Sequence, residues 1–306
     1  MAVVEVSRVT YRYGKITALS DLDFTVPQGA LYALLGPNGS GKTTLLQILI
    51  GLRRTQSGRV SLIGRESSTL TLKERSAIGY IAEGQSLPKW MRLEQLEAYL
   101  APLYDTWDAA LARDLRERFN LDPRRTIGTL SRGEHMKAAL LCALAPRPKL
   151  LLMDEPFTGM DALVKDDLVR GLLESAGSEG WSVLLCSHDI GELELLADWV
   201  GFLDAGRMRL SEPMESVRDR FKVVELTMSD DVSAAAIPVS SDWLSFERAG
   251  SRASFVVSHT GDDLGTLLRA QLPHATRIDV RAATLREVFI ALAKRPASRV
   301  TREVAA

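Results

Sequence analysis

The chain has little cysteine and no long apolar run. Only two of its 306 residues are cysteines, Cys142 and Cys186, and each lies inside a short apolar run. We expect both to be buried free thiols rather than a disulfide pair, which indicates a reducing compartment. No apolar stretch approaches the roughly 18 residues that a membrane-spanning helix needs. These absences argue against a disulfide scaffold and against an integral membrane protein.

The chain also lacks an excess of charge of either sign. Its net charge is −1 and no long basic tract stands out, so the electrostatics do not indicate a nucleic-acid partner. The first six residues hold no basic segment before an apolar core, so we expect no signal peptide. The composition is typical of a soluble cytoplasmic protein, and the length predicts about two domains.

The most informative feature present is the stretch Gly-Pro-Asn-Gly-Ser-Gly-Lys-Thr at residues 36–43. It satisfies the P-loop pattern, in which glycines let successive backbone N–H groups point at phosphate oxygens. An apolar run at 31–35 predicts a strand before it, and residues 44–50 predict a helix after it. Lys42 is predicted to reach the terminal phosphates and Thr43 to bind Mg²⁺. The predicted nucleotide-binding residues here are Gly36, Pro37, Asn38, Gly39, Ser40, Gly41, Lys42, Thr43 and Thr44.

Two acids follow a second apolar strand, predicted at residues 150–153. The carboxyl ends of buried parallel strands lie at the ligand crevice of such sheets. Asp154 is therefore predicted to hold Mg²⁺ through water, and Glu155 to polarise an attacking water as a general base. His188 follows another apolar run, and its position downstream of the two acids favours a place in the same site over a structural role.

Ser131 and Glu134 have the capping-box spacing S-x-x-E before a helix with an apolar face. A capped helix N-terminus with Gly133 beside it can also bind an anionic phosphate. The structural and the functional interpretation of this segment are compatible.

The order of apolar runs predicts an α/β fold, with a mostly parallel sheet and a helical insertion. From about residue 221 the pattern restarts as a smaller α+β unit. We therefore expect an α/β ATP-binding domain at 1–220 with a helical subdomain at about 87–145. A small C-terminal α+β domain at 221–294 and a loose tail at 295–306 should follow.

The order of these motifs resembles the ATP-binding domain of ABC transporters over roughly residues 1–220. The motifs are the P-loop, residues 130–134, Asp154 with Glu155, residues 159–161, and His188. The resemblance implies a P-loop NTPase fold and a head-to-tail dimer that holds ATP and Mg²⁺ between two subunits. It further implies roles for particular residues: Tyr13 stacks on adenine, Ser131 and Gly133 touch the γ-phosphate held by the second subunit, Asp161 lies at the dimer seam, and His188 holds the γ-phosphate and orients Glu155.

Two departures from the family pattern are similar to the ABC-2 type branch, and in particular to its YtrB-like bacterial exporters. Arg132 and Glu134 replace a glycine and a glutamine of the signature, and Arg132 would be strained if its backbone had positive φ. Glu83 stands where a glutamine normally binds Mg²⁺, with Gln85 two residues on, and either could take that role. Residues 284–289 also resemble the short C-terminal domain of that branch.

We therefore predict an ATP-hydrolysing transporter subunit, with Lys42, Glu155 and His188 as catalytic residues. A second ABC subunit, identical or different, and a separate transmembrane permease are the expected partners. The permease would hold the chain at the inner face of the membrane, and the direction would be export. Leu87, Trp90 and Met91 are apolar residues that either pack in the core or contact the permease, and Trp90 or its neighbours are the predicted contact. The alternatives are a soluble ABC ATPase with a mechanical or regulatory role and, less favoured, a small-molecule kinase. The sequence names no transported substrate.

Overall fold

The computed structural model describes residues 1–161, 164–165, 168–170, 180–191, 193–194, 197–228, 240, 242–261 and 263–294. The chain divides into two compact units. Unit 1 is Met1–Asp189 with Leu196–Ser211, and unit 2 is Ile190–Leu195 with Glu212–Ala306. Unit 1 contains two sheets and unit 2 one, and each unit has its own apolar core. The expected tail at 295–306 lies outside the described residues.

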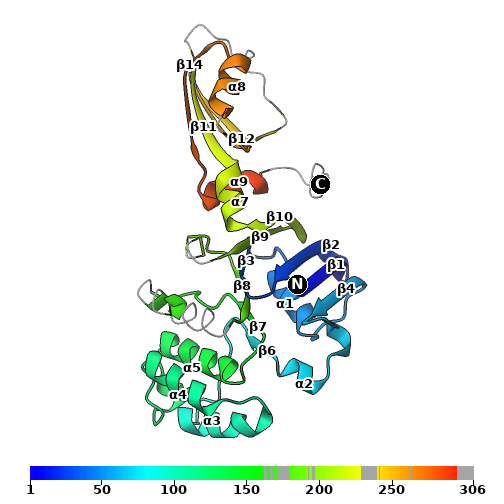
Figure 1. The fold of residues 1–306 in the computed structure, drawn as a ribbon, viewed down its shortest axis with the longest axis vertical. Helices are drawn as coiled ribbons and strands as arrows, with labels where there is room; N and C mark the ends of the chain where they lie inside the picture. Colours follow the sequence, from blue (N-terminus) through cyan, green and yellow to red (C-terminus); the bar gives the residue numbers. More distant parts are fainter. Residues whose placement is uncertain are drawn as a thin grey trace. The chain divides into compact units, whose positions relative to one another are not determined.

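A six-stranded sheet forms the centre of unit 1. Its strands are β3 (Leu31–Leu35), β6 (Ile78–Ile81), β7 (Leu150–Asp154), β8 (Ser182–Ser187), β9 (Trp199–Asp204) and β10 (Arg207–Pro213). Their order is β10-β9-β3-β8-β7-β6 (Figure 1). The strands from β6 to β9 pair in parallel, as predicted. β3, β7 and β8 are buried along their whole length, which explains their continuous apolar runs.

A second sheet of unit 1 is antiparallel, and the sequence pattern did not indicate that it is separate. Its strands are β1 (Ala2–Tyr13), β2 (Ile16–Pro27), β4 (Ser57–Leu62) and β5 (Arg65–Glu66). Their order is β2-β1-β4-β5, with Val4 opposite both Val26 and Leu62. Alternating burial along β2 places one face of this sheet against the core of the unit. The sheet carries Tyr13 at the end of β1.

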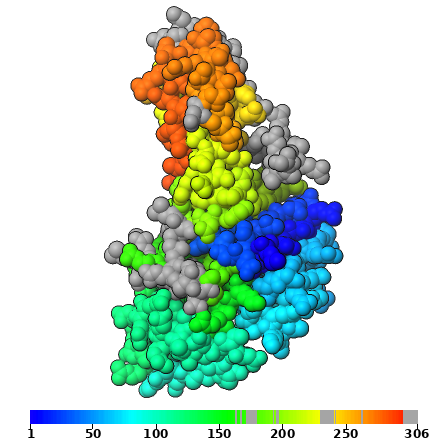
Figure 2. Space-filling model, viewed as in Figure 1, coloured from blue at the N-terminus to red at the C-terminus, as the bar shows by residue number. Residues whose placement is uncertain are grey.

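The described helices of unit 1 include a group between β6 and β7 in the chain. The described helices of the whole unit are α1 (Lys42–Leu49), α2 (Leu72–Arg75), α3 (Leu93–Leu100), α4 (Ala109–Arg118) and α5 (Arg132–Leu144), with 3₁₀ turns η1 (Ser67–Thr69), η2 (Ala101–Leu103) and η3 (Ile127–Thr129). The group between β6 and β7 consists of α3, α4 and α5. α3 and α4 both pack against α5, and α5 contacts β6. In the space-filling view these helices form a continuous teal to green surface (Figure 2).

The predicted capping box starts α5. The Glu134 N–H donates to the Ser131 hydroxyl, and the Glu134 carboxylate accepts from the Ser131 N–H at 2.8 Å. Both partners satisfy groups that a helix N-terminus otherwise leaves without a bond. The start of this helix is therefore fixed by local chemistry.

Cys142 and Cys186 are buried free thiols, as predicted. Burial raises the pKa of Cys142 to about 12 and the pKa of Cys186 well above its usual value. Neither thiol forms a thiolate near neutral pH, so both act as small apolar side chains. None of the described helices is both long enough and apolar enough to cross a membrane.

Unit 2 is built on a four-stranded antiparallel sheet. Its strands are β11 (Phe221–Met228), β12 (Trp243–Ala249), β13 (Arg252–Ser258) and β14 (Ala275–Ala282), and its helices are α7 (Met214–Arg220), α8 (Leu264–Gln271) and α9 (Leu285–Ala293). The order is β12-β13-β11-β14. Leu226 and Phe255 pack with Leu268 of α8, and the Trp243 ring stacks on Phe255 with centroids 3.9 Å apart.

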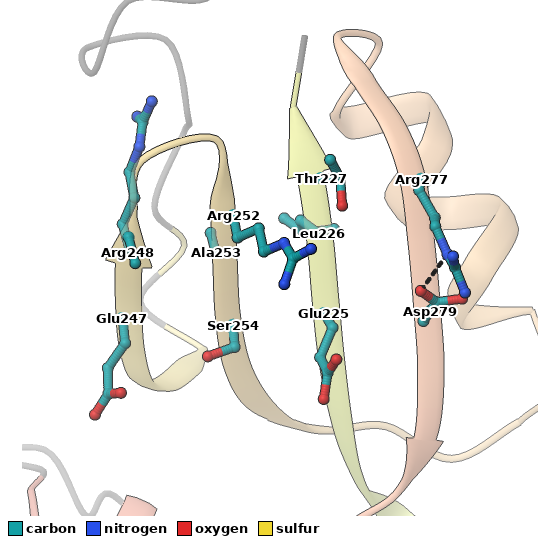
Figure 3. Close-up of a pocket in the computed structure, with 11 residues that line it drawn as sticks. Glu225, Leu226, Thr227, Glu247, Arg248, Arg252, Ala253, Ser254, Arg277 and Asp279 are labelled. Atoms are coloured by element: carbon teal, nitrogen blue, oxygen red, sulfur yellow. Dashed lines mark ion pairs between the residues drawn. The ribbon is translucent and has the colours of Figure 1, made fainter. Parts of the chain in front are cut away.

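A polar hollow of about 520 Å³ lies over the strands of this second sheet. Glu225 and Thr227 alternate along β11 with the buried Leu226, so they belong to the face away from the core. Figure 3 shows Arg252 reaching from β13 across β11, and Arg277 paired with Asp279 on β14. The walls of this hollow are charged and open to solvent.

Candidate nucleotide site

The P-loop connects β3 to α1, in the strand–loop–helix context that the motif requires. Gly39 and Gly41 have φ of +79° and +110°, which glycine adopts without strain. At Gly36, an added Cβ would lie 2.1 Å from the carbonyl oxygen of Leu203. The glycines at these three positions are therefore required by backbone geometry.

Exposure divides the predicted phosphate-binding residues into two groups, with Gly41 intermediate between them. The exposed ones are Pro37, Asn38, Gly39 and Thr43, and the buried ones are Gly36, Ser40, Lys42 and Thr44. The hydroxyl of Ser40 is buried and has no hydrogen-bond partner among the described residues. Since an unsatisfied buried hydroxyl is unfavourable, this group is available to a ligand.

Lys42 joins the P-loop to the acids after β7. Its ammonium donates to the carbonyl oxygens of Gly36 at 2.7 Å and Pro37 at 3.3 Å. The same nitrogen lies 3.4 Å from Oε1 of Glu155. Because Lys42 and Glu155 are both buried, this pair is removed from the screening of water.

Glu155 brings the three predicted catalytic residues together. Its Oε2 accepts a hydrogen bond from Nδ1 of His188 at 2.7 Å and from the His188 backbone N–H at 3.3 Å. The side chain of His188 is 44% exposed and that of Glu155 only 8%. Glu155 itself has a φ of +46°, a strained conformation for a side-chain-bearing residue. Strain of this kind concentrates at functional sites, and no residue pattern indicated it beforehand.

Asp154 lies beside this cluster at the end of β7 and is almost fully buried. Burial raises its pKa, the hydrogen bond from the Thr43 hydroxyl lowers it, and the charges of Glu155 and Glu83 raise it further. Oδ1 of Asp154 has no hydrogen-bond partner among the described residues. The site therefore holds a buried carboxylate oxygen that a cation would satisfy.

The two candidates for the Q-loop role differ in their surroundings. Glu83 is exposed and its charge acts on Asp154. Gln85 uses its side-chain oxygen to accept from the N–H of Ala82 at 3.1 Å. The structure thus leaves the Glu83 carboxylate available and occupies the amide oxygen of Gln85.

Tyr13 stands at the end of β1, close to α1. It is 41% exposed, and its hydroxyl lies 3.3 Å from the hydroxyl of Thr44. The Arg53 guanidinium lies over its ring, 4.8 Å from the centroid. The sequence pattern did not reveal this contact, because Arg53 is 40 positions from Tyr13 and the two residues belong to no common motif.

The signature residues surround the start of α5. Among the described residues, Ser131 makes its side-chain hydrogen bonds only within the capping box, and it is exposed. Gly133 is buried, and an added Cβ would lie 2.4 Å from Cγ1 of Val164. Arg132 does not have positive φ, so the strain considered for it is absent. Its guanidinium lies against Gly159, where an added Cβ would come within 2.2 Å of Nη1.

Asp161 closes the segment that follows Glu155. Its Oδ1 accepts a hydrogen bond from the N–H of Val164 at 3.0 Å, as a helix-capping aspartate does. The contact fixes the backbone that leads away from the acids. Asp161 remains exposed, and so it is accessible to a second molecule.

The predicted permease contact is only partly exposed. Trp90 is 78% exposed, whereas Leu87 is buried and belongs to the core. For Leu87 the core alternative therefore holds, because its side chain is used in packing within the unit. Backbone bonds tie this segment to η3: the N–H of Ile127 donates to the carbonyl of Met91, and Gly128 donates to Lys89.

Comparison with known proteins identifies the family. A family model for ABC transporters matches residues 19–158. The lantibiotic transport ATP-binding protein SrtF of Streptococcus pyogenes is 32% identical over 212 residues, which cover 69% of this chain and 90% of SrtF. The sulfate/thiosulfate import ATP-binding protein CysA of Synechococcus elongatus is 32% identical over 69% of this chain, which spans 63% of the length of CysA.

A third relative and a solved structure extend this result. The ABC transporter ATP-binding protein YtrB of Bacillus subtilis is 25% identical over 273 residues, 89% of this chain and 92% of YtrB. A solved ATP-binding subunit of an ABC transporter superposes with a TM-score of 0.64 and 27% identity, covering 71% of this chain and 92% of its own. The predicted family and fold are confirmed. The chain belongs to the ATP-binding subunits of ABC transporters, which hydrolyse ATP.

Proposed function

We propose that the cluster of Lys42, Glu155 and His188 is the hydrolytic centre of this ATPase. The observation that carries the proposal is the position of Glu155, held between the ammonium of Lys42 and Nδ1 of His188. In this arrangement the glutamate polarises the attacking water, and Lys42 stabilises negative charge on the transferring phosphoryl group. His188 orients Glu155 and reaches the γ-phosphate, which its greater exposure permits.

The residues beside the cluster fit Mg²⁺. The unpartnered Oδ1 of Asp154, the hydroxyl of Thr43 and the carboxylate of Glu83 are the oxygen donors that this ion prefers. Among the described residues no group of three acidic, histidine or cysteine side chains could hold a metal. The few oxygen donors of Asp154, Thr43 and Glu83 suit an ion whose other ligands are phosphate oxygens and water. Mg²⁺ would neutralise charge on the phosphates; Glu83, rather than Gln85, takes the Q-loop role.

The adenine base of ATP and a second subunit complete the site. Tyr13 stacks on adenine, and the P-loop surrounds the phosphates. Two subunits close head to tail, so that Ser131 and Gly133 of one reach the γ-phosphate bound by the other. Support comes from the exposure of Ser131 and Asp161, which leaves both able to face a second molecule.

We propose that a separate transmembrane permease binds at Trp90 and keeps the chain at the inner face of the membrane. The exposed indole suits an interface anchor. Backbone bonds from its neighbours to η3 lead directly to Leu130 and Ser131, which gives the permease a route to the signature. Export is the direction favoured by the YtrB-like pattern. Residues 1–220 serve as the ATP-binding domain and 221–294 as an accessory domain.

Phosphate release by the purified chain tests the hydrolytic proposal. Mg-ATP should yield phosphate without any second substrate, and removal of the metal with EDTA should abolish turnover while leaving the fold intact by circular dichroism. Phosphate release that requires an added small-molecule acceptor would make the chain a kinase instead. Turnover that persists in EDTA would contradict the role of Mg²⁺.

Trp90→Glu tests the docking surface. The variant should fold and hydrolyse ATP alone, yet lose co-sedimentation with membranes that contain the permease. Tyr99→Glu, at another exposed aromatic of the same unit, is the matched control and should sediment normally. If Trp90→Glu sediments as the unaltered chain does, the proposed surface is wrong.

A further inference from the structure

Arg53 covers the aromatic side chain that stands at the proposed base site. Its guanidinium carbon lies 4.8 Å from the ring centroid of Tyr13 and 5.8 Å from that of Tyr11. The two tyrosine rings meet edge to face, with centroids 5.0 Å apart and an interplanar angle of 76°. The three side chains therefore form one cluster at the end of β1.

Hydrogen bonds fix the guanidinium in this position. Nη1 donates to the hydroxyl of Tyr11 at 3.0 Å, and Nε donates to the side-chain oxygen of Gln47 on α1. The backbone N–H of Arg53 also donates to the carbonyl of Gln47 at 3.1 Å. Among the residues that the structure describes, no carboxylate pairs with Arg53. A long, flexible side chain is thus held by neutral groups where its charge faces aromatic rings.

Tyr13 is in turn held by both its ring and its hydroxyl. The hydroxyl lies 3.3 Å from the hydroxyl of Thr44, the ring has the Arg53 guanidinium over it, and 41% of the residue is exposed. Thr44 immediately follows the phosphate-binding loop. A base stacked on the accessible part of this ring would therefore continue from phosphates bound at the start of α1.

We propose that Arg53 is a positioning residue for nucleotide binding, one that orients Tyr13 and increases its preference for purine bases. A cation over one face of an aromatic ring draws on its π-electrons and makes the ring a better partner for an electron-rich base. Purines have a larger π-surface than pyrimidines, so the gain is greater for ATP than for UTP. The inference rests on the proposed function, since it assumes that Tyr13 receives the base.

Equilibrium binding of three probes tests the proposal. ATP, UTP and inorganic tripolyphosphate separate the contribution of the base from that of the phosphates. Arg53→Ala should raise the Kd for ATP about 2- to 5-fold, the range of an exposed cation–π contact. The Kd for UTP should change less, and the Kd for tripolyphosphate and the kcat at saturating ATP should not change. The affinity ratio of ATP to UTP is therefore the diagnostic quantity.

Two further variants and a control separate charge from packing. Arg53→Lys keeps a cation and should retain most of the ATP-to-UTP ratio, whereas Arg53→Gln keeps hydrogen bonding without charge and should lose it. Arg54→Ala removes the neighbouring exposed arginine and should leave all three probes unaffected. The melting temperature of each variant shows whether the chain remains folded.

Three results would overturn the proposal. The ratio could stay unchanged in Arg53→Ala, ATP could bind more tightly because Arg53 occupies the base position, or ATP and tripolyphosphate could weaken equally. Failure of the proposed function gives a different result. In that case the affinity of the unaltered chain for the three probes would not fall when Lys42 is replaced by alanine.

Discussion

Two clusters of charged residues in this molecule differ in their exposure to water. Around Glu155, the charged side chains of Lys42, Asp154 and Glu155 are buried and converge at the carboxyl end of β7. On the unit 2 sheet, Arg277 and Asp279 pair at 2.6 Å but are 72% and 53% exposed. The first cluster bears the cost of desolvating several ions, whereas the second bears almost none.

The difference shows why the size of a hollow is a poor guide to chemistry. The hollow over the unit 2 sheet is large, but its charged side chains are solvated and several of them pair with neighbours, such as Glu247 with Lys294 at 2.5 Å. The buried cluster instead contains an oxygen of Asp154 without a hydrogen-bond partner among the described residues, while Oε1 of Glu155 has only the ion pair with Lys42. Buried charged groups that lack some of their hydrogen-bond partners are typical of a site that binds a charged ligand.

Removing the cation of the buried cluster should have the largest effect. Lys42→Ala is expected to lower ATP turnover by at least about 100-fold, because the developing phosphoryl charge loses a preorganised partner. Lys73→Ala, at an exposed position of α2, should leave turnover unchanged. Steady-state phosphate release measures both. Near-normal turnover in Lys42→Ala would place the chemistry elsewhere.

Removing the partially exposed member of the cluster should rank second. His188→Ala is expected to cost about 10- to 100-fold in kcat, because Glu155 loses the Nδ1 hydrogen bond that orients it. ATP affinity should change less than kcat. His274→Ala, an exposed histidine of unit 2, is the control. Unchanged kinetics in His188→Ala would reduce its contact with Glu155 to a structural one.

The ion pair of Arg281 and Glu287 in unit 2, which has two hydrogen bonds, should affect stability rather than turnover. Hydrogen bonds from Arg281 lower the pKa of Glu287 to about 2. A carboxyl whose folded pKa is depressed contributes stability above its unfolded pKa and loses it as pH falls through the folded value. Glu287→Gln keeps the capping spacing of α9 but removes the charge. It should destabilise α9 and β14 by about 1 kcal/mol at pH 7, after allowance for solvent screening.

Hydrogen exchange of the α9 and β14 amides in the full chain measures this effect. The difference between variant and unaltered chain should shrink as pH falls from about 4.5 towards about 2. Glu215→Gln, at an exposed glutamate of α7, should show no such difference. A pH-independent loss in Glu287→Gln would point to packing rather than charge.

The exposed pair on the open face of unit 2 should show the smallest effect. Arg277→Ala removes the partner of Asp279, and the expected change in unfolding free energy is below about 0.5 kcal/mol, because water replaces the contact. ATP turnover should be unchanged. Chemical denaturation and phosphate release check the two statements. A large loss of stability or of ATP turnover would show that the charged residues of this face matter as much as those around Glu155.

Local signals made much of unit 1 predictable. The P-loop and the Ser131 capping box depend on residues within eight positions of one another, so their spacing alone specified the structure. The buried strands β3, β7 and β8 are continuous apolar runs, and the acids at the end of β7 follow from that position. Motif order then identified the family.

The remainder depends on pairings between distant residues. The separate antiparallel sheet is set by contacts such as Val4 with Leu62, and a run of alternating residues does not name its partner. The cover of Tyr13 by Arg53 arises because α1 brings the two together. Spacing also left open which of Leu87 and Trp90 is buried, because it cannot distinguish a buried apolar side chain from an exposed one. The positive φ of Glu155 reflects strain that the surrounding structure imposes.

Glu155 is proposed as the group that activates water, and Glu155→Gln is the variant that isolates this role. The amide retains the size of the side chain and removes only its capacity as a base. Molecular mass by light scattering with Mg-ATP, together with phosphate release, is the decisive measurement. We predict that the variant binds ATP, fails to release phosphate and doubles in mass as the closed dimer accumulates. A variant that stays monomeric with ATP while hydrolysing it at the normal rate would show that Glu155 is not the base.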